Sequence, residues 1–287
     1  MSLQDKTICF IGAGSMAEAI VRGLTGQNKV RPKQITVLNR GDAAKLERLK
    51  RSYGVLVAAA EAERFRAAAA ADLVVLAMKP KDAEEALRTY APHLKDGQLL
   101  ISVIAGLSAA LIQKLAGRSL PVVRTMPNTS STIGLGATGM SFTAGVSAEQ
   151  RALAREIFES VGIVCEVEEP LLDIITGVSG SGPAYVYLLM EAMIRAGVQG
   201  GLDEQASRLL TAQTVLGAAE MVLRTGEDPA ELRRKVTSRG GTTEAALRVL
   251  EEGRVPDCLS RAVLRAAERA AEMGEDIERR IGRGNEH

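Results

Sequence analysis

Short apolar runs alternate with helix-like stretches through the first half of the chain, and this alternation constrains the fold more than any other feature. Parallel strands need a crossover between them, usually a helix, so the pattern predicts a parallel sheet covered by helices. The expected strands are residues 7–11, 34–38, 55–57, 73–78, 99–104 and 122–125, with 134–142 and 163–167 extending the sheet. The helices expected between them are residues 16–24, 43–51, 81–90, 108–116 and 148–161.

After Pro170 the strand-like runs stop and only helix-like segments follow. These segments are residues 184–196, 204–224, 229–236, 243–252 and 257–281. With 287 residues the chain is long enough for two domains, each with its own core. We therefore predict an α/β fold in which residues 1–168 form a parallel-sheet domain and residues 169–287 form an all-α domain.

The composition excludes several classes of protein. A net charge of +1 argues against nucleic acid or an anionic membrane surface as the main partner. No apolar run reaches the length of a membrane span, and the first residues lack the layout of a signal peptide, so we expect a cytoplasmic protein. Cys9, Cys165 and Cys258 are far apart, which favours reduced thiols over disulfides, and we expect no metal site.

The first expected strand runs into GAGSMA at residues 12–17, which matches the G-x-G-x-x-A fingerprint of dinucleotide-binding proteins. Gly12 makes the tight turn, Gly14 lets a pyrophosphate approach, and Ala17 permits close packing of helix on sheet. A plain glycine turn is the alternative, but here the motif follows a strand and opens a helix. We therefore expect a Rossmann-like domain that binds a nicotinamide dinucleotide.

Two further strand ends lie at the sheet edge where such ligands bind. After the second strand stand Asn39 and Arg40, where NAD-dependent enzymes usually carry an acidic residue. Because an arginine can pair with a 2′-phosphate, we expect NADPH as the cofactor, with NADH as the alternative and a solvated arginine as the plain interpretation. Met78, Lys79 and Pro80 end another strand at this edge, where Lys79 either contacts the cofactor or is solvated.

A second glycine-rich helix start lies near the other end of the chain, in VTSRGGTTEAAL at residues 236–247. Gly240 and Gly241 allow a tight turn and a close approach to a ligand. Thr242 is a natural N-cap, and the N–H groups of the next turn form a site for a small anion. One glycine turn suits a pyrophosphate and the other a small carboxylate, which indicates an enzyme that brings a dinucleotide to a small acid.

Histidine is scarce, since the chain has only His93 and His287. His93 precedes an expected strand, so it should lie in a surface loop at the edge opposite the ligand site. Reduction of a ketone leaves an alkoxide that needs a proton, usually from a histidine or lysine, whereas reduction of a protonated imine gives a neutral amine directly. A site served by threonine and backbone N–H groups therefore favours C=N over C=O as the bond reduced.

With these residues assembled, the chain resembles the pyrroline-5-carboxylate reductases, the family that catalyses the last step of proline biosynthesis. The resemblance runs nearly end to end. It is carried by the motifs at residues 10–17, 78–80, 123–129, 178–185 and 236–247. It implies a Rossmann domain, a helical C-terminal domain that interlocks with its twin, and hydride transfer from NAD(P)H to the cyclic imine 1-pyrroline-5-carboxylate.

The resemblance also implies roles for individual residues. Ser238, Gly241 and Thr242 would hold the substrate carboxylate, and Thr243 would hydrogen-bond the imine nitrogen. On the cofactor side, the resemblance implies contacts from four further residues: backbone groups of Ser15 and Met16 to the pyrophosphate, and Pro127 and Asn128 lining the nicotinamide pocket.

Three positions depart from the family pattern. Arg239 and Ser130 stand where the family usually has proline, and the asparagine often found near Glu61 is absent. Arg239 makes the loop less rigid and adds a charge beside the expected carboxylate site. The departure near Glu61 bears on the choice of cofactor.

Other functions remain open. A β-hydroxyacid dehydrogenase would need a lysine in the helical domain, but after Lys114 the chain has only Lys235, beside the glycine loop. A broader imine reductase, which would reduce C=N bonds in other substrates, is the second alternative. A non-catalytic NADP-binding regulator of reductase ancestry is the third alternative, and the intact loop at residues 240–243 argues against it.

The segment at residues 204–224 is apolar on more than one side. A helix that is apolar most of the way round is buried, here by a second subunit. We therefore expect a homodimer or a higher homo-oligomer.

Overall fold

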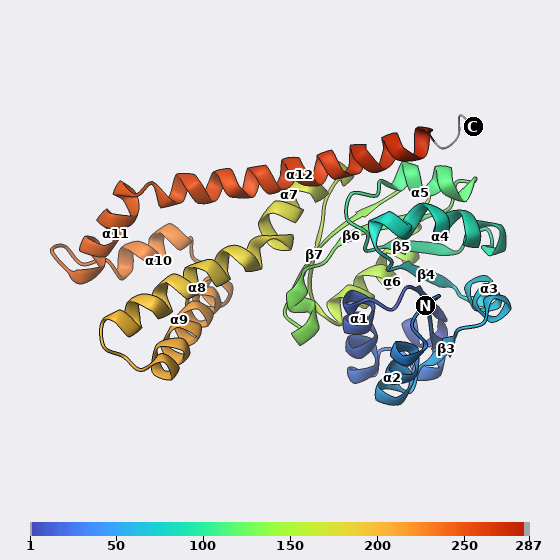
Figure 1. Ribbon diagram of the computed structural model, residues 1–287, viewed down its shortest axis with the longest axis horizontal. Coiled ribbons are helices and arrows are strands. Elements are labelled where there is room, and N and C mark those ends of the chain that lie inside the picture. Colours follow the sequence, from blue (N-terminus) through green and yellow to red (C-terminus); the bar gives the residue numbers. More distant parts are fainter. Residues whose placement is uncertain (1, 284–287) are drawn as a thin grey trace. The chain divides into compact units, whose positions relative to one another are not determined.

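The computed structural model describes residues 2–283 and divides into two compact units (Figure 1). The first contains residues up to 180 together with the described residues from 265 onward, and the second contains residues 181–264. The expected boundary at residue 168 thus lies inside the first unit. A short helix, α7 (Leu172–Ile175), and a π-helical turn (Thr176–Gly180) follow it there. The start of the substrate-binding half at residue 169 stays a prediction.

The first unit is built on an eight-stranded sheet in the order β3-β2-β1-β4-β5-β6-β7-β8. The strands are β1 (Ile8–Ile11), β2 (Ile35–Leu38), β3 (Leu56–Ala58), β4 (Leu73–Leu76), β5 (Leu99–Ser102), β6 (Val122–Met126), β7 (Gly136–Phe142) and β8 (Gly162–Glu166). The first six in that order are parallel and give the Rossmann arrangement, so the predicted fold class is confirmed. Only the β6–β7 pair is antiparallel among the described strands, because a short 3-10 turn joins the two.

Helices cover both faces of this sheet, so its strands are apolar on both sides. Ile8 and Phe10 of β1 belong to one hydrophobic core, and Cys9 and Ile11 belong to the other, as the alternation of side chains along a strand requires. The helices are α1 (Ser15–Gly26), α2 (Ala43–Tyr53), α3 (Glu61–Ala70), α4 (Ala83–Tyr90), α5 (Ala109–Ala116) and α6 (Ala148–Glu159).

Of these helices, α3 was not among those expected from the sequence. Its sequence, EAERFRAAAA, has no clear apolar stripe, and alanine alone marks no face. The high helix propensity of alanine supports the helix in its place.

The part of α12 (Val255–Arg283) that belongs to the first unit packs on the turn after β5. A Cβ on Gly274 would lie 3.0 Å from the carbonyl oxygen of Gly106, so the two backbones touch. Ser108 Oγ also donates to Glu278 Oε1 at 3.0 Å. The chain therefore returns at its end to the domain in which it began.

The second unit is helical, as predicted. It contains α8 (Gly182–Gln199), α9 (Glu204–Thr225), α10 (Pro229–Lys235), α11 (Thr242–Glu252) and the first part of α12. Gly197 lets α8 approach α9 closely, because a Cβ there would lie 2.2 Å from Ser207 Oγ. Along α9 only Ser207 and Thr211 are buried, whereas Leu209 and Leu223 are 69% and 73% exposed.

Candidate functional site

The turn between β1 and α1 has the geometry of a pyrophosphate site. Gly12 has φ of +110°, and a Cβ there would lie 2.5 Å from the carbonyl oxygen of Ala77, so only glycine fits. Gly14 is the N-cap of α1, and no side chain caps the N–H groups of the first turn. Uncapped N–H groups at a helix start suit an anion, so these residues fit a dinucleotide.

Glu18 follows one turn into α1 and carries the opposite charge from its neighbour Arg48 on α2. Arg48 donates to both carboxylate oxygens, at 2.6 and 2.7 Å. The hydrogen bond from Arg48 is the main reason that the pKa of Glu18 is lowered. The pair joins α1 to α2 and offsets a negative charge near the expected pyrophosphate.

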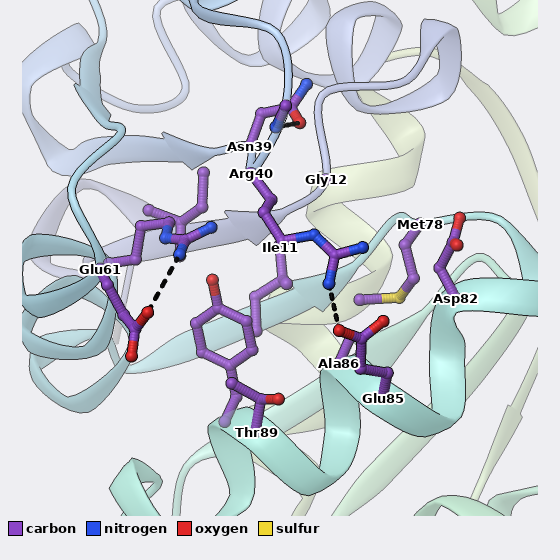
Figure 2. A pocket seen from close by; sticks show the side chains of 14 residues that line it. Ile11, Gly12, Asn39, Arg40, Glu61, Met78, Asp82, Glu85, Ala86 and Thr89 are labelled. Carbon is purple, nitrogen blue, oxygen red and sulfur yellow. Dashed lines mark hydrogen bonds and ion pairs between the residues drawn. The ribbon is translucent and has the colours of Figure 1, made fainter.

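A cavity of about 510 Å³ opens beside this turn, at the carboxyl ends of β1, β2 and β4 (Figure 2). It lies where parallel sheets bind their ligands. Its walls are formed by Ile11, Gly12, Leu38, Asn39, Arg40, Gly41, Glu61, Arg64, Met78, Asp82, Glu85, Ala86, Thr89 and Tyr90. The structure therefore brings together four of the residues that the sequence singled out: Gly12, Asn39, Arg40 and Met78.

Arg40 crosses this cavity to a partner on α4. Its guanidinium Nη1 donates to Glu85 Oε1 (Figure 2). Asn39 Oδ1 accepts from the N–H of Gly41 at 3.2 Å and so shapes the turn that carries Arg40. Arg40 is thus neither a free surface cation nor buried, because its side chain is 67% exposed and ion-paired.

The other cofactor residues expected from sequence lie outside the cavity walls. Lys79 is exposed, and Pro80 opens the 3-10 turn that leads into α4. Ser15 and Met16 begin α1, where their N–H groups belong to the uncapped turn. Their contacts with a cofactor stay predictions.

Pro127 and Asn128 serve the interior of the first unit. Pro127 is buried. Asn128 Nδ2 donates to the carbonyl oxygen of Ser179 at 3.0 Å, and its Oδ1 accepts from the N–H of Ala137 at 3.2 Å. The amide therefore ties the π-helical turn to β7, and the expected contact with nicotinamide stays a prediction.

An aromatic cluster lies behind the cavity. Tyr90, in the wall, meets Phe65 edge-on with the ring centres 5.6 Å apart, and burial raises the pKa of its phenol. His93 stacks on the same Phe65 at 4.0 Å. His93 is part of a 3-10 turn before β5 rather than a loose surface loop, and it does not line the cavity. His287 lies outside the described residues.

In the second unit, the glycine loop opens α11 in a way that corrects one expectation. Thr242 was expected to be the N-cap, but the structure has Gly241 there, because Gly241 has the extended backbone of a cap (φ −85°, ψ 174°) and Thr242 is already helical. No side chain caps the first turn. Instead Glu244 accepts from the N–H of Gly240 at 2.7 Å, where φ is +71°.

Gly241 is also held close to Ser238. Its N–H donates to the carbonyl oxygen of Ser238 at 3.0 Å, and a Cβ on Gly241 would lie 2.5 Å from Ser238 Oγ. The loop thus gathers the hydroxyl of Ser238 and the start of α11, with half-buried Thr243 in its first turn. This is the arrangement required of an anion site with a neighbouring hydroxyl donor.

Within residues 2–283 the structure has neither a metal-binding cluster nor a membrane-spanning helix. No group of three or more histidine, cysteine, aspartate or glutamate side chains could hold a metal ion. None of the helices described there has the length and apolar character needed to cross a membrane.

Ten residues of the cavity wall were not singled out for a site from sequence. Three of them lie at the ends of the first two strands, and the other seven are Glu61, Arg64, Asp82, Glu85, Ala86, Thr89 and Tyr90. These seven come from the segments after the third and fourth strands. The topology alone would therefore direct attention to the helices after those strands. Within these helices, however, charged residues recur at many positions, and nothing local marks those that face the cavity.

Comparison with known families agrees with this architecture. Residues 169–273 match the family described as pyrroline-5-carboxylate reductase dimerisation. Residues 7–106 match the family described as NADP oxidoreductase, coenzyme F420-dependent. The helical part and the sheet part therefore both have counterparts among known oxidoreductases.

Individual relatives cover nearly the whole chain. Pyrroline-5-carboxylate reductase 1 of Bacillus subtilis is 42% identical over 275 residues, which are 96% of this chain and 92% of the relative. The reductase of Pseudomonas aeruginosa is 41% identical over 96% of this chain and 99% of its own length.

Solved structures give the same result. The reductase of Coxiella burnetii has a TM-score of 0.87 at 40% identity, covering 93% of this chain and 98% of that one. The Plasmodium falciparum enzyme, solved with NADP bound, has a TM-score of 0.84 at 30% identity, covering 94% and 99%. The chain belongs to the pyrroline-5-carboxylate reductase family.

Proposed function

We infer that this protein reduces the cyclic imine 1-pyrroline-5-carboxylate to L-proline with NAD(P)H, the last step of proline biosynthesis. Support comes from reductases of that name that are 42% and 41% identical over 96% of the chain. The structural observation that carries the inference is the loop at residues 238–243, whose helix start is uncapped and which contains no histidine.

On the cofactor side, NAD(P)H supplies the hydride. The uncapped turn at Gly14, with Ser15 and Met16, would hold the pyrophosphate, and the cavity beside it would take the adenosine half. Arg40 would pair with a 2′-phosphate there. The nicotinamide contacts assigned to Pro127 and Asn128 would then depend on how Asn128 holds the π-helical turn.

On the substrate side, we propose that the start of α11 holds the carboxylate. The hydroxyl of Ser238 and the N–H of Thr242 would donate to it, Gly241 would let it approach without a Cβ in the way, and the hydroxyl of Thr243 would hydrogen-bond the ring nitrogen. Once hydride reaches the carbon of a protonated imine, the product is a neutral amine, so the loop needs to orient that nitrogen rather than supply a proton.

The function is tested by following oxidation of NADPH with 1-pyrroline-5-carboxylate as substrate and identifying proline as the product. We expect turnover with this imine, and slower or no turnover with cyclic imines that lack the carboxylate. Equal rates with and without the carboxylate would favour a broader imine reductase. Cofactor binding without turnover would favour a regulator, and oxidation of a β-hydroxyacid would favour a dehydrogenase.

Arg40→Ala is expected to weaken NADPH binding roughly tenfold while changing NADH binding little, since a charge-assisted hydrogen bond contributes about 1.5–3 kcal/mol. Titration of cofactor fluorescence measures both dissociation constants. Arg51→Ala is the control, because Arg51 is an exposed α2 residue paired with Glu47 outside the cavity. Equal losses for both cofactors would mean that Arg40 positions the turn and does not select the phosphate.

We propose that the assembly is a homodimer, with a higher homo-oligomer as the alternative. The second unit exposes Tyr187, Leu188, Leu209, Leu210 and Met221, more apolar surface than a monomer normally carries. We expect light scattering at low micromolar concentration to give at least twice the chain mass. A folded, active monomer would contradict this.

We also propose the cytoplasm as the compartment. Cys9, Cys165 and Cys258 are free thiols in the structure. Such thiols persist where disulfides are kept reduced. An oxidised form isolated from cells under non-reducing conditions would contradict the assignment.

A further inference from the structure

The cavity beside the glycine turn contains two arginines, and each faces a glutamate. Arg40 lies in the turn after β2 and pairs with Glu85 of α4. Arg64 comes from α3, and its Nη2 lies 4.0 Å from Oε2 of Glu61 on the same helix. All four residues line the cavity, and Figure 2 shows Arg40 facing Glu85, with Glu61 on a different helix.

Arg64 is bound less completely than Arg40 despite being more deeply buried. Its side chain is 12% exposed, and its Nε is enclosed with no hydrogen-bond partner among the described residues. The separation from Glu61 is at the outer limit of an ion pair. Guanidinium N–H groups that are removed from water without a partner are costly, so such a donor indicates a missing acceptor.

Because Nε is enclosed, an anion in the cavity would meet the rest of the Arg64 guanidinium, which Glu61 holds only loosely. Arg64 lines the same space as Arg40, and a phosphate has enough acceptor oxygens to bind two guanidinium groups. A ribose hydroxyl would accept from one guanidinium N–H but has no negative charge to attract Arg40 and Arg64.

Glu85 affects such an anion in the opposite way. It holds Arg40 when the cavity contains no phosphate, and a phosphate that binds Arg40 must compete with it. Because both are negative, the carboxylate also repels the phosphate at short range. A ribose with free 2′ and 3′ hydroxyls meets neither penalty.

We propose that Arg64 completes the 2′-phosphate subsite that Arg40 begins, and that Glu85 sets the preference between NADPH and NADH by competing for Arg40. This inference rests on the proposed use of NAD(P)H. It makes Arg64 and Glu85 specificity-determining residues, and neither needs to touch the reacting atoms.

The test uses 2′,5′-ADP and 5′-AMP, which differ in the 2′-phosphate, and measures their binding to the full-length protein by calorimetry. Arg64→Met is expected to weaken 2′,5′-ADP about tenfold and 5′-AMP less than about twofold. Arg64→Lys, which keeps the charge but not the planar fork, should fall between. Glu85→Gln should tighten 2′,5′-ADP by about three- to tenfold and leave 5′-AMP unchanged.

Two matched controls lie on the same helices. Arg66→Met changes an exposed arginine of α3, and Glu84→Gln changes a glutamate of α4 that pairs with Arg88, and neither residue lines the cavity. Both controls should leave the two dissociation constants within about twofold of the original protein. Thermal unfolding of every variant shows whether a loss of binding comes from a loss of folding.

The outcomes separate this inference from the proposed function. If Arg64→Met and Arg64→Lys weaken both nucleotides equally, or if Glu85→Gln weakens 2′,5′-ADP, the inference is overturned while the cofactor site stands. If the original protein binds neither nucleotide, the cofactor site itself is wrong. Neither measurement requires substrate or turnover.

Discussion

Replacement of Gly12 by alanine is expected to lower the free energy of unfolding by about 2–5 kcal/mol and to abolish cofactor binding. The added Cβ would lie 2.5 Å from the carbonyl oxygen of Ala77 and 2.9 Å from the N–H nitrogen of Met78. Neither is a flexible side chain, so β4 or the turn must move. The φ of +110° adds strain for any residue with a Cβ. Urea denaturation measures the first effect and cofactor fluorescence the second.

Substitutions of two other glycines in this region distinguish the loss of stability from the loss of cofactor binding. Gly26→Ala adds a Cβ to the last turn of α1 with no atom within 4 Å, so the protein should be at least as stable as before. Gly14→Ala meets only one atom, the carbonyl oxygen of Ala77 at 3.6 Å, and should fold normally but bind cofactor weakly. A Gly12→Ala protein with unchanged stability would show that the turn is not constrained as described.

Replacement of Thr243 by valine is expected to lower turnover by about one to two decades while leaving NADPH affinity nearly intact. Valine has almost the same shape as threonine but has no hydroxyl oxygen to accept from the protonated ring nitrogen of the substrate. Thr243 is half-buried in the first turn of α11, where the uncapped helix start is proposed to hold the carboxylate. Steady-state kinetics with 1-pyrroline-5-carboxylate and a cofactor titration are the two measurements.

Two control variants test whether the loss of turnover comes from the Thr243 hydroxyl. Thr243→Ser keeps it and should recover most of the turnover. Thr225→Val removes a hydroxyl of the same unit that donates to the carbonyl oxygen of Met221 at 2.7 Å, and should leave kinetics unchanged. If Thr243→Val matches the original enzyme, Thr243 has no part in the reaction.

Much of the fold was predictable because its signals are local. The strands β1 to β5 are short, largely apolar runs, and residues such as Gly12 and Pro80 interrupt the pattern after them. The helix α3 was missed because the alanine run has no amphipathic face. The unit boundary also differs from the expected one, because the end of α12 packs back against the first unit and compactness depends on such contacts between distant segments.

In the candidate site, too, residues within local motifs could be predicted from the sequence and residues outside them could not. The glycine turns, Arg40 and the loop around Gly241 were found because each belongs to a motif of adjacent residues. The capping of α11 was assigned wrongly to Thr242, since Gly241 and Thr242 are both acceptable caps and the backbone angles decide between them. Arg64 and Glu85 were not found, because on a helix surface they resemble any other solvated charge.

The sequence by itself determined the order of strands and helices, the two glycine-rich helix starts and the family to which they belong, because these depend on residue spacing along the chain. Only the tertiary structure decided which charges converge on the cavity beside Gly12. Arg40, Arg64 and Glu85 come from three separate elements, and their interaction depends on distances in space that no local pattern encodes.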